Sequence, residues 1–197
     1  MKITVVSDYV CPYCLVAEEA LRIALERTGI SAEITLLPYE LTREGEEQVD
    51  TWSDPVRRSH YTVLNAPCEQ MALPMHLPPH VVPRPYSTLA FEGWHFACEQ
   101  GRGEAYTDAA FRAYFMDEQK IDELDVVCGI AEKAGLDVPS FREAMEKRLY
   151  REKQREAADY TRNVLKVHQV PTMYIDGEQV EINDYTPEEF VRLLTER

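Results

Sequence analysis

The pattern of apolar and polar positions in the first part of the chain predicts a strand, a helix and a second strand. The β-branched, apolar run at residues 3–7 is typical of a short buried strand. Apolar residues then recur at helical spacing over residues 15–25, and Gly29 is placed to end that helix. A second strand follows at residues 32–37 and ends at Pro38. A strand–helix–strand unit of this length predicts two parallel strands joined by a right-handed crossover.

A long helical region occupies the middle of the chain, from Tyr86 to about Val167. Its apolar positions predict four helices, with breaks at residues 101–103 and at Gly135. Residues 150–167 either extend the fourth helix or form a fifth one. The charges between residues 151 and 156 predict a solvated face of that stretch. Its apolar residues predict a buried face, formed by Ala157, Ala158, Tyr160, Val164 and Leu165.

The pattern returns to strands near the end of the chain. Residues 172–175 are β-branched or aromatic, Asp176 and Gly177 are typical of a hairpin turn, and residues 179–182 predict an antiparallel return. Thr186 followed by Pro187 predicts the start of a last helix. The whole pattern predicts an α/β fold. Residues 1–38 and 168–197 are expected to form one discontinuous domain, and residues 39–167 a loop and an all-helical insertion.

The first helix begins directly after Cys11, and Cys14 completes the Cys-x-x-Cys spacing of redox-active dithiols. Pro12 suits the first helical position, since its fixed φ fits a helix and its missing N–H loses no hydrogen bond there. This placement puts the Cys11 sulfur at the positive end of the helix dipole, which favours a thiolate. We therefore expect Cys11 to attack and Cys14, one turn further on, to resolve. Asp8 is a nearby carboxylate that opposes thiolate formation if its charge lies close.

Residues 39–85 show no clear periodicity. Their first part is acidic and polar, and a proline-rich part follows. A segment of this length is usually functional or ordered by its own packing. It either covers the end of the sheet that carries the cysteines and contributes to a substrate groove, or serves only as a structural connector. The prolines are Pro67, Pro74, Pro78, Pro79, Pro83 and Pro85.

Composition limits the functions that the chain can have. Its 197 residues carry a net charge of −14, which argues against nucleic-acid binding because phosphates require basic surfaces. No stretch approaches the length of a membrane span, and the first residues show no apolar run followed by a cleavage site. We therefore expect a cytoplasmic protein, in which a Cys-x-x-Cys pair is more often catalytic or metal-binding than a permanent cross-link.

Three further cysteines and five histidines are candidates for other roles. Cys98 and Cys128 lie among apolar helical residues, which predicts buried and unreactive thiols, whereas Cys68 is expected in a loop and its role stays open. A metal centre at the Cys-x-x-Cys pair would require two or more further ligands nearby. We expect no metal, because none of the histidines has tight ligand spacing to the pair. They are His60, His76, His80, His95 and His168.

Two segments together resemble the DsbA-like branch of the thioredoxin superfamily, in its FrnE-like or 2-hydroxychromene-2-carboxylate isomerase-like group. They are residues 7–14 (Ser-Asp-Tyr-Val-Cys-Pro-Tyr-Cys) and residues 170–177 (Val-Pro-Thr-Met-Tyr-Ile-Asp-Gly). The resemblance spans nearly the whole chain and implies a thioredoxin-like fold with an all-helical insertion.

The resemblance also implies roles for residues around the cysteines. It implies a cis peptide bond before Pro171, packed against the sulfurs, and a Val170 backbone that pairs with an extended substrate. Thr172 either helps in this pairing or simply begins the strand. Pro12 and Tyr13 resemble the corresponding pair of glutaredoxins and are implied to shape the active site and its redox poise.

The implied activity is thiol–disulfide exchange through a mixed-disulfide intermediate, with protein or small-molecule thiols and disulfides as partners. No bound cofactor is expected, and glutathione or another thiol–disulfide couple is the expected co-substrate. The isomerase side of the resemblance implies an alternative, a glutathione-dependent isomerase or transferase acting on a small aromatic compound. A non-catalytic interaction module with vestigial cysteines is a third interpretation. The helical insertion offers a face for a homodimer, and the oligomeric state stays open.

Overall fold

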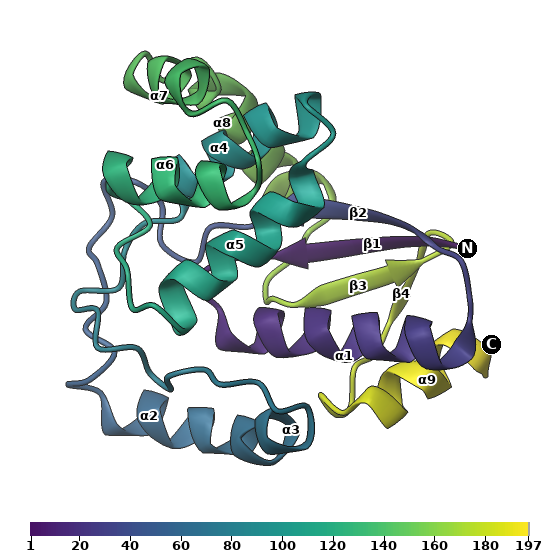
Figure 1. Ribbon diagram of the computed structural model, residues 1–197. Coiled ribbons are helices and arrows are strands. Elements are labelled where there is room, and N and C mark those ends of the chain that lie inside the picture. Colours follow the sequence, from purple (N-terminus) through teal and green to yellow (C-terminus); the bar gives the residue numbers. More distant parts are fainter. Residues whose placement is uncertain (197) are drawn as a thin grey trace.

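The computed structural model describes residues 1–196 and places a mixed four-stranded sheet at the centre of that part of the chain (Figure 1). The strands are β1 (Lys2–Ser7), β2 (Glu33–Pro38), β3 (Thr172–Ile175) and β4 (Glu178–Val180), in the order β2-β1-β3-β4. β1 pairs with β2 in parallel, and β3 is antiparallel to both β1 and β4. The predicted parallel pair and the predicted hairpin are confirmed.

Helices flank the sheet on both faces. Within residues 1–196 they are α1 (Pro12–Thr28), α2 (Pro55–Tyr61), α3 (Asn65–Gln70), α4 (Thr88–Glu99), α5 (Gly103–Phe115), α6 (Leu124–Lys133), α7 (Val138–Glu146), α8 (Arg151–Asp159) and α9 (Pro187–Thr195), with a 3₁₀ turn at Thr62–Leu64 and a π turn at Tyr160–Val164. None of these helices combines the length and apolar character that crossing a membrane requires.

The side chains of the sheet alternate between two layers. Ile3 and Val5 of β1 and Met173 of β3 share a core cluster with α1 and α9, which lie on one face of the sheet (Figure 1). Val6 belongs to a smaller, separate cluster with Val167, the residue that follows the π turn by three positions. The apolar run at the start of the chain is therefore buried on both faces of β1, as the sequence predicts.

The bounds of α1 follow from its sequence. Cys11 caps the helix with an extended backbone (φ −96°, ψ 113°), and Pro12 takes the first helical position. Gly29 ends the helix at φ 67°, a left-handed conformation that glycine adopts without a steric penalty. α9 begins with the predicted cap, in which the amide of Glu189 donates to Thr186 Oγ1.

The helices α4 to α8 form a layer whose core continues into the turn between β1 and α1. Tyr9 and Val10 of that turn belong to the largest core cluster of the described residues. Tyr9 is fully buried, stacks on Phe91 with ring centroids 4.4 Å apart, and meets Phe111 edge-on at 5.2 Å. Its hydroxyl lies 3.1 Å from Thr107 Oγ1. The predicted helical insertion is confirmed, and it anchors the turn that leads to the cysteines.

Residues 150–167 form a separate helix, α8, followed by the π turn. The predicted buried face of this stretch is partly wrong. Ala158 is buried, but Tyr160 and Val164 are 45% and 64% exposed. The fully buried positions are instead polar, namely Gln154 and Thr161. A search for apolar periodicity cannot find a buried face of this kind.

A buried polar network explains why Gln154 lies in the interior. Its side-chain amide donates to Glu40 Oε1 at 2.7 Å, and its Oε1 lies 3.1 Å from His95 Nε2 on α4. Glu40, which follows β2, also accepts from Thr88 Oγ1 at 2.7 Å. Buried polar groups are costly unless they are hydrogen-bonded. The network therefore ties the segment after β2 to both α4 and α8.

Residues 39–85 are more ordered than the sequence predicts, since they contain α2, a 3₁₀ turn and α3. Asp54 caps α2 by accepting from the amides of Val56 and Arg57, and Pro55 occupies the first helical position. α2 has seven residues and α3 has six, so neither is long enough to display a helical period. The sequence feature that could have predicted α2 is its start, where Asp54 is followed by Pro55.

Close packing of α4 against two neighbouring helices generates a test of the helical layer. A Cβ atom at Gly93 would lie 2.2 Å from Tyr106 Oη and 2.7 Å from Phe141 Cζ, and both rings are fully buried. We expect Gly93→Ala to lower the free energy of unfolding by about 1–3 kcal/mol through overpacking, measured by urea denaturation. Gly129→Ala in α6 is the matched control, since a Cβ there meets no atom within 4 Å.

In the control, alanine should raise the free energy of unfolding by about 0.5–1 kcal/mol, because glycine is a poor residue in a helix interior. Equal effects of the two substitutions would contradict the packing described at Gly93.

Candidate functional site

The side chains of Cys11 and Cys14 lie at the junction of β1 and α1 and come within 3.4 Å of each other. The turn is closed by the Cys11 amide, which donates to the Asp8 carbonyl at 3.0 Å, and the Cys14 amide donates to the Cys11 carbonyl at 3.1 Å. Both thiols are free, and the residues are 4% and 0% exposed. The pair is a reduced dithiol whose sulfurs are close enough to form a disulfide after a small approach.

The two thiols have different surroundings. Cys11 is the N-cap of α1 and lies at the positive end of the helix dipole. Burial, together with the hydrogen bond to Cys11, raises the pKa of Cys14 well above its usual value, and the Ser7 hydroxyl and the Asp8 amide oppose this only in part. Cys14 is therefore a neutral thiol at rest. An attacking and a resolving thiol require this asymmetry.

The segment before β3 forms the other side of the dithiol. The Val170–Pro171 peptide bond is cis, as the resemblance implies, and Cys11 Sγ donates to the Val170 carbonyl at 3.6 Å. Thr172 is buried at the start of β3, and its hydroxyl donates to the Gln169 carbonyl at 2.7 Å. The Thr172 hydroxyl thus braces this turn, while Val170 presents its backbone to the dithiol.

Tyr13, between the cysteines, links α1 to α2. Its hydroxyl donates to the His60 carbonyl at 2.8 Å, and its ring lies against Tyr185 with centroids 5.1 Å apart. Pro12 is buried, and Val16, one turn after it, shares a core cluster with residues of the segment after α2. Of the two alternatives for residues 39–85, this packing favours a segment that flanks the dithiol.

Asp8, the carboxylate that the sequence places near Cys11, is fully buried below the turn. Its Oδ2 accepts from the Leu41 amide at 2.7 Å, and its Oδ1 accepts from the Val10 amide at 3.3 Å. Burial raises the pKa of Asp8 to about 6, although the Leu41 hydrogen bond and the charge of Arg84 act in the opposite direction. Asp8 therefore joins the turn to the segment after β2 and titrates close to neutral pH.

Sequence reasoning missed a second carboxylate near the dithiol, Glu18. Ser7 Oγ donates to Glu18 Oε1 at 3.1 Å. The Ser7 hydroxyl has one proton, so it stabilises the charged form of Cys14 only when it turns from Glu18 to that sulfur. Burial raises the pKa of Glu18 to about 8. Ser7 thus connects Glu18 to Cys14. The sequence did carry a signal, because residues four apart on a helix, such as Cys14 and Glu18, share one face.

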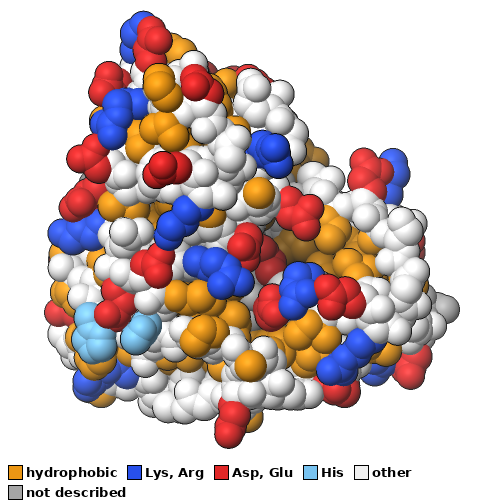
Figure 2. Space-filling model, viewed as in Figure 1, with side chains coloured by type: hydrophobic (Ala, Val, Ile, Leu, Met, Phe, Trp, Pro, Cys, Tyr) orange, Lys and Arg blue, Asp and Glu red, His pale blue; other side chains and the backbone are white. Residues whose placement is uncertain are grey.

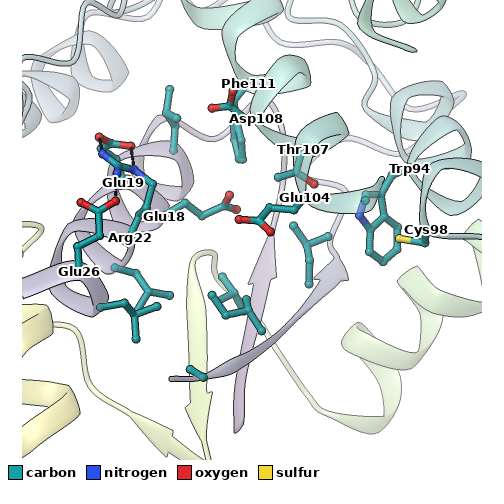
Figure 3. A pocket seen from close by; sticks show the side chains of 18 residues that line it. Glu18, Glu19, Arg22, Glu26, Trp94, Cys98, Glu104, Thr107, Asp108 and Phe111 are labelled. Carbon is teal, nitrogen blue, oxygen red and sulfur yellow. Dashed lines mark hydrogen bonds and ion pairs between the residues drawn. The ribbon is translucent and has the colours of Figure 1, made fainter. Parts of the chain in front are cut away.

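Glu18 also lines a groove of about 530 Å³ between α1, α5 and β2. Figure 2 shows this groove as a hollow with acidic side chains near its rim and hydrophobic side chains inside it. Figure 3 shows the carboxylates of Glu18 and Glu104 pointing toward each other across the groove. Cys11, Cys14 and Val170 are not among the lining residues. The groove is therefore separate from the dithiol, and Glu18 lies between the two, hydrogen-bonded to Ser7.

The other three cysteines lie outside the dithiol site. Cys68 is buried in α3, not in an open loop, and burial raises its pKa to about 11. Cys98 is exposed at the end of α4, so its predicted burial is wrong, yet partial burial of the sulfur raises its pKa to about 11. Cys128 is buried as predicted, and burial raises its pKa. All three are weak nucleophiles at neutral pH, since the thiolate is the reactive form.

The fold defines the class of protein. A central sheet with the order β2-β1-β3-β4, a dithiol where β1 passes into α1, and a cis proline facing it from the start of β3 are the features of a thioredoxin-like fold. The helical layer α4 to α8 is an insertion of the kind found in DsbA-like proteins, and comparison with known families agrees. The chain belongs to the family of DSBA-like thioredoxin domains, whose model matches residues 2–193.

Individual relatives span nearly the whole chain. "Uncharacterized protein YwbO" of Bacillus subtilis is 36% identical over 179 residues, which cover 90% of this chain and 88% of the relative. The crystal structure of a probable DsbA oxidoreductase, SCO1869, from Streptomyces coelicolor is similar with a TM-score of 0.80 at 22% identity, covering 100% of this chain and 89% of that one.

Two further solved structures have similar folds. A 2-hydroxychromene-2-carboxylate isomerase has a TM-score of 0.76 at 18% identity, covering 100% of this chain and 94% of that one. The cytosolic disulfide reductase DsbM from Pseudomonas aeruginosa, solved with GSH, has a TM-score of 0.70 at 17% identity, covering 98% and 97%. Oxidoreductases and an isomerase therefore share this fold.

The buried Glu18 carboxyl generates a test by pH. Its folded-state pKa of about 8 lies above the ordinary 4.5, so the folded protein holds a proton that the unfolded chain releases between these values. Wild-type stability should therefore fall, relative to Glu18→Gln, as the pH rises from about 4.5 to about 8. The slope is at most about 1.4 kcal/mol per pH unit, and water near the partly exposed side chain reduces it.

Urea denaturation of the reduced protein at several pH values measures this difference. Glu132→Gln is the matched control, because it removes an exposed carboxylate on α6 that does not line the groove. A stability difference between wild type and Glu18→Gln that stays constant with pH would contradict the burial of the Glu18 carboxyl.

Proposed function

We propose that this protein is a thiol–disulfide oxidoreductase that uses Cys11 and Cys14 as a redox-active dithiol. The observation that carries the proposal is the pair of free thiols within 3.4 Å of each other at the N-terminus of α1, with the Val170 carbonyl 3.6 Å from Cys11 Sγ. The similar fold of proteins named as a DsbA oxidoreductase and a disulfide reductase supports it.

The proposed reaction has two exchange steps. The Cys11 thiolate attacks a substrate disulfide, forms a mixed disulfide, and releases one substrate sulfur as a thiolate. Cys14 then loses its proton and attacks Cys11 Sγ, which forms the Cys11–Cys14 disulfide and releases the second substrate sulfur. Two electrons pass from the dithiol to the substrate disulfide. The same steps in reverse oxidise a substrate dithiol.

The second step requires a proton to leave a buried thiol. The Asp8 amide stabilises the charged form of Cys14. The Ser7 hydroxyl, which donates to Glu18 at rest, does so when its one proton turns to the Cys14 sulfur. Since burial raises the pKa of Glu18 to about 8, its carboxyl exchanges a proton close to neutral pH. We assign Glu18 and Ser7 as positioning residues that assist the loss of the Cys14 proton.

Substrate recognition is proposed to use the backbone beside the dithiol. In the resting state the Val170 carbonyl accepts from the Cys11 thiol. Once Cys11 is a thiolate it no longer donates, and the carbonyl becomes available to the backbone of an extended substrate. Pro171 holds this turn, Thr172 contributes by bracing it, and Pro12 and Tyr13 shape the start of α1 on the other side.

The disulfide must be reduced again for further turnover. Glutathione, or another thiol–disulfide couple, is the proposed co-substrate, and no bound cofactor is needed for the exchange chemistry. The similar reductase DsbM was solved with GSH. A cytosolic location, where thiols are kept reduced, would make the protein a reductase of substrate disulfides.

A glutathione-dependent isomerase or transferase acting on a small aromatic compound is the second candidate. The similar fold of a 2-hydroxychromene-2-carboxylate isomerase favours it. Such a reaction has no use for a resolving thiol, whereas Cys14 lies within 3.4 Å of Cys11. We therefore place dithiol exchange first.

Thiol trapping in glutathione buffers of graded redox poise tests the proposal. We expect mass spectrometry to detect a reversible Cys11–Cys14 disulfide in the wild type. Cys11→Ser should reduce disulfide exchange to the uncatalysed rate, because it removes the nucleophile. Cys14→Ser should accumulate a mixed disulfide at Cys11, because the resolving step is lost. Cys98→Ser is the control, since its thiol lies outside the site, and it should behave as wild type.

Two outcomes would count against dithiol exchange. Full exchange activity in Cys11→Ser would show that another group is the nucleophile. A wild-type Cys11 that carries only glutathione, with no internal disulfide at any poise, would move the glutathione-dependent enzyme to first place.

A further inference from the structure

A second cluster of reactive side chains lies on the surface, away from the dithiol. His76 and His80 belong to the proline-rich segment before α4, and Glu118 follows α5. One ligand atom from each of the three residues lies within 4.8 Å of the other two. Among residues 1–196, this is the one group of three or more His, Cys, Asp or Glu side chains with such spacing.

The distances within the cluster fit a small metal ion. Zinc bonds of 2.0–2.1 Å in a tetrahedral site place neighbouring donor atoms ~3.3 Å apart. His80 Nδ1 lies 2.7 Å from Glu118 Oε1, and His76 Nδ1 lies 3.9 Å from the same oxygen. The two separations lie on either side of the required value. The donor atoms of His76 and His80 lie within 4.8 Å of each other. Side-chain shifts of about 1 Å or less, with loss of any proton shared by His80 and Glu118, therefore bring all three donor atoms to the required spacing.

The three residues are held in place by contacts that leave the site open to solvent. The His76 amide donates to the Phe115 carbonyl at 2.8 Å, and the His80 amide donates to Glu118 Oε1 at 2.7 Å. Trp52 stacks on the His80 ring with centroids 4.7 Å apart. Outer contacts of this kind orient metal ligands. The His76 and His80 side chains are 50% and 66% exposed, so an ion has direct access.

We propose that His76, His80 and Glu118 form a binding site for a divalent transition metal, with Zn²⁺ as the best match. Two imidazoles and one carboxylate are ligands that suit zinc and its neighbours in the first transition row, and water completes the coordination. The net charge of −14 raises the local concentration of cations. The ion joins the proline-rich segment to the end of α5. It requires no contribution from Cys11 or Cys14 and does not depend on the proposed redox function.

The bound ion also restrains the segment before His76, which packs near α1. Leu73 and Met75, which lie within three residues before His76, pack against the core cluster that contains Val16 of α1. Fixing His76 to Glu118 therefore restrains the segment that reaches this cluster. The expected result is a protein that is more stable with zinc than without it, because the ion binds the folded chain and not the unfolded one.

Calorimetric titration with Zn²⁺ tests the site. The full chain with Cys11→Ser and Cys14→Ser serves as background, because a dithiol also binds zinc. We expect one saturable site per chain. His80→Ala and, separately, Glu118→Gln should each weaken binding roughly tenfold or more, since even outer contacts of a metal site are worth that much. His168→Ala is the matched control, as His168 is an exposed histidine outside the cluster, and it should leave the affinity unchanged.

His76→Ala provides an independent variant, since His80 also stacks on Trp52. Zinc should raise the melting temperature of the background protein and of His168→Ala, but not of His76→Ala. The proposal is overturned if zinc fails to saturate one site, or if His76→Ala and His80→Ala bind it as tightly as the background protein does.

Discussion

The structure depends on the way in which the short turn between β1 and α1 is fixed. Tyr9 places its ring among the aromatic residues of the helical layer, and Asp8 accepts a hydrogen bond from the segment that follows β2. The turn is therefore held from two sides by parts of the chain that are distant in sequence. These contacts hold Cys11 at the cap of α1 and within reach of Val170. The position of the dithiol therefore depends both on the helical layer, through Tyr9, and on the segment after β2, through Asp8.

Most of the frame could be predicted because its elements are long enough to show a period. The run in β1, the apolar stripe of α1 and the cap of α9 each follow from local chemistry that the rest of the fold does not override. The position of Cys11 followed in the same way, since Pro12 specifies where the helix begins. The two short helices α2 and α3 gave no period, and α8 buries polar residues through partners that lie far away in sequence.

The geometry around the dithiol was harder to anticipate. The cis bond before Pro171 came only from the resemblance to DsbA-like proteins, and the bonds before Pro78 and Pro83, which are also cis, had no sequence signal. The burial of Asp8 and the link from Ser7 to Glu18 depend on packing that no local pattern encodes. The division of the chain at residues 38 and 168 stays a prediction. The core that Tyr9 shares with the helical layer crosses that division.

The chain contains two tryptophans, and the fold gives them different environments. Trp52 lies flat against the ring of His80 in a surface segment, whereas Trp94 lines the groove between α1 and α5 and is tilted against His95. Indole emission responds to the groups that touch the ring, so the intrinsic fluorescence of this protein is the sum of two unrelated local signals. Replacing either indole by phenylalanine turns the other one into a single-site optical reporter, without attaching a dye to a chain that already has five thiols.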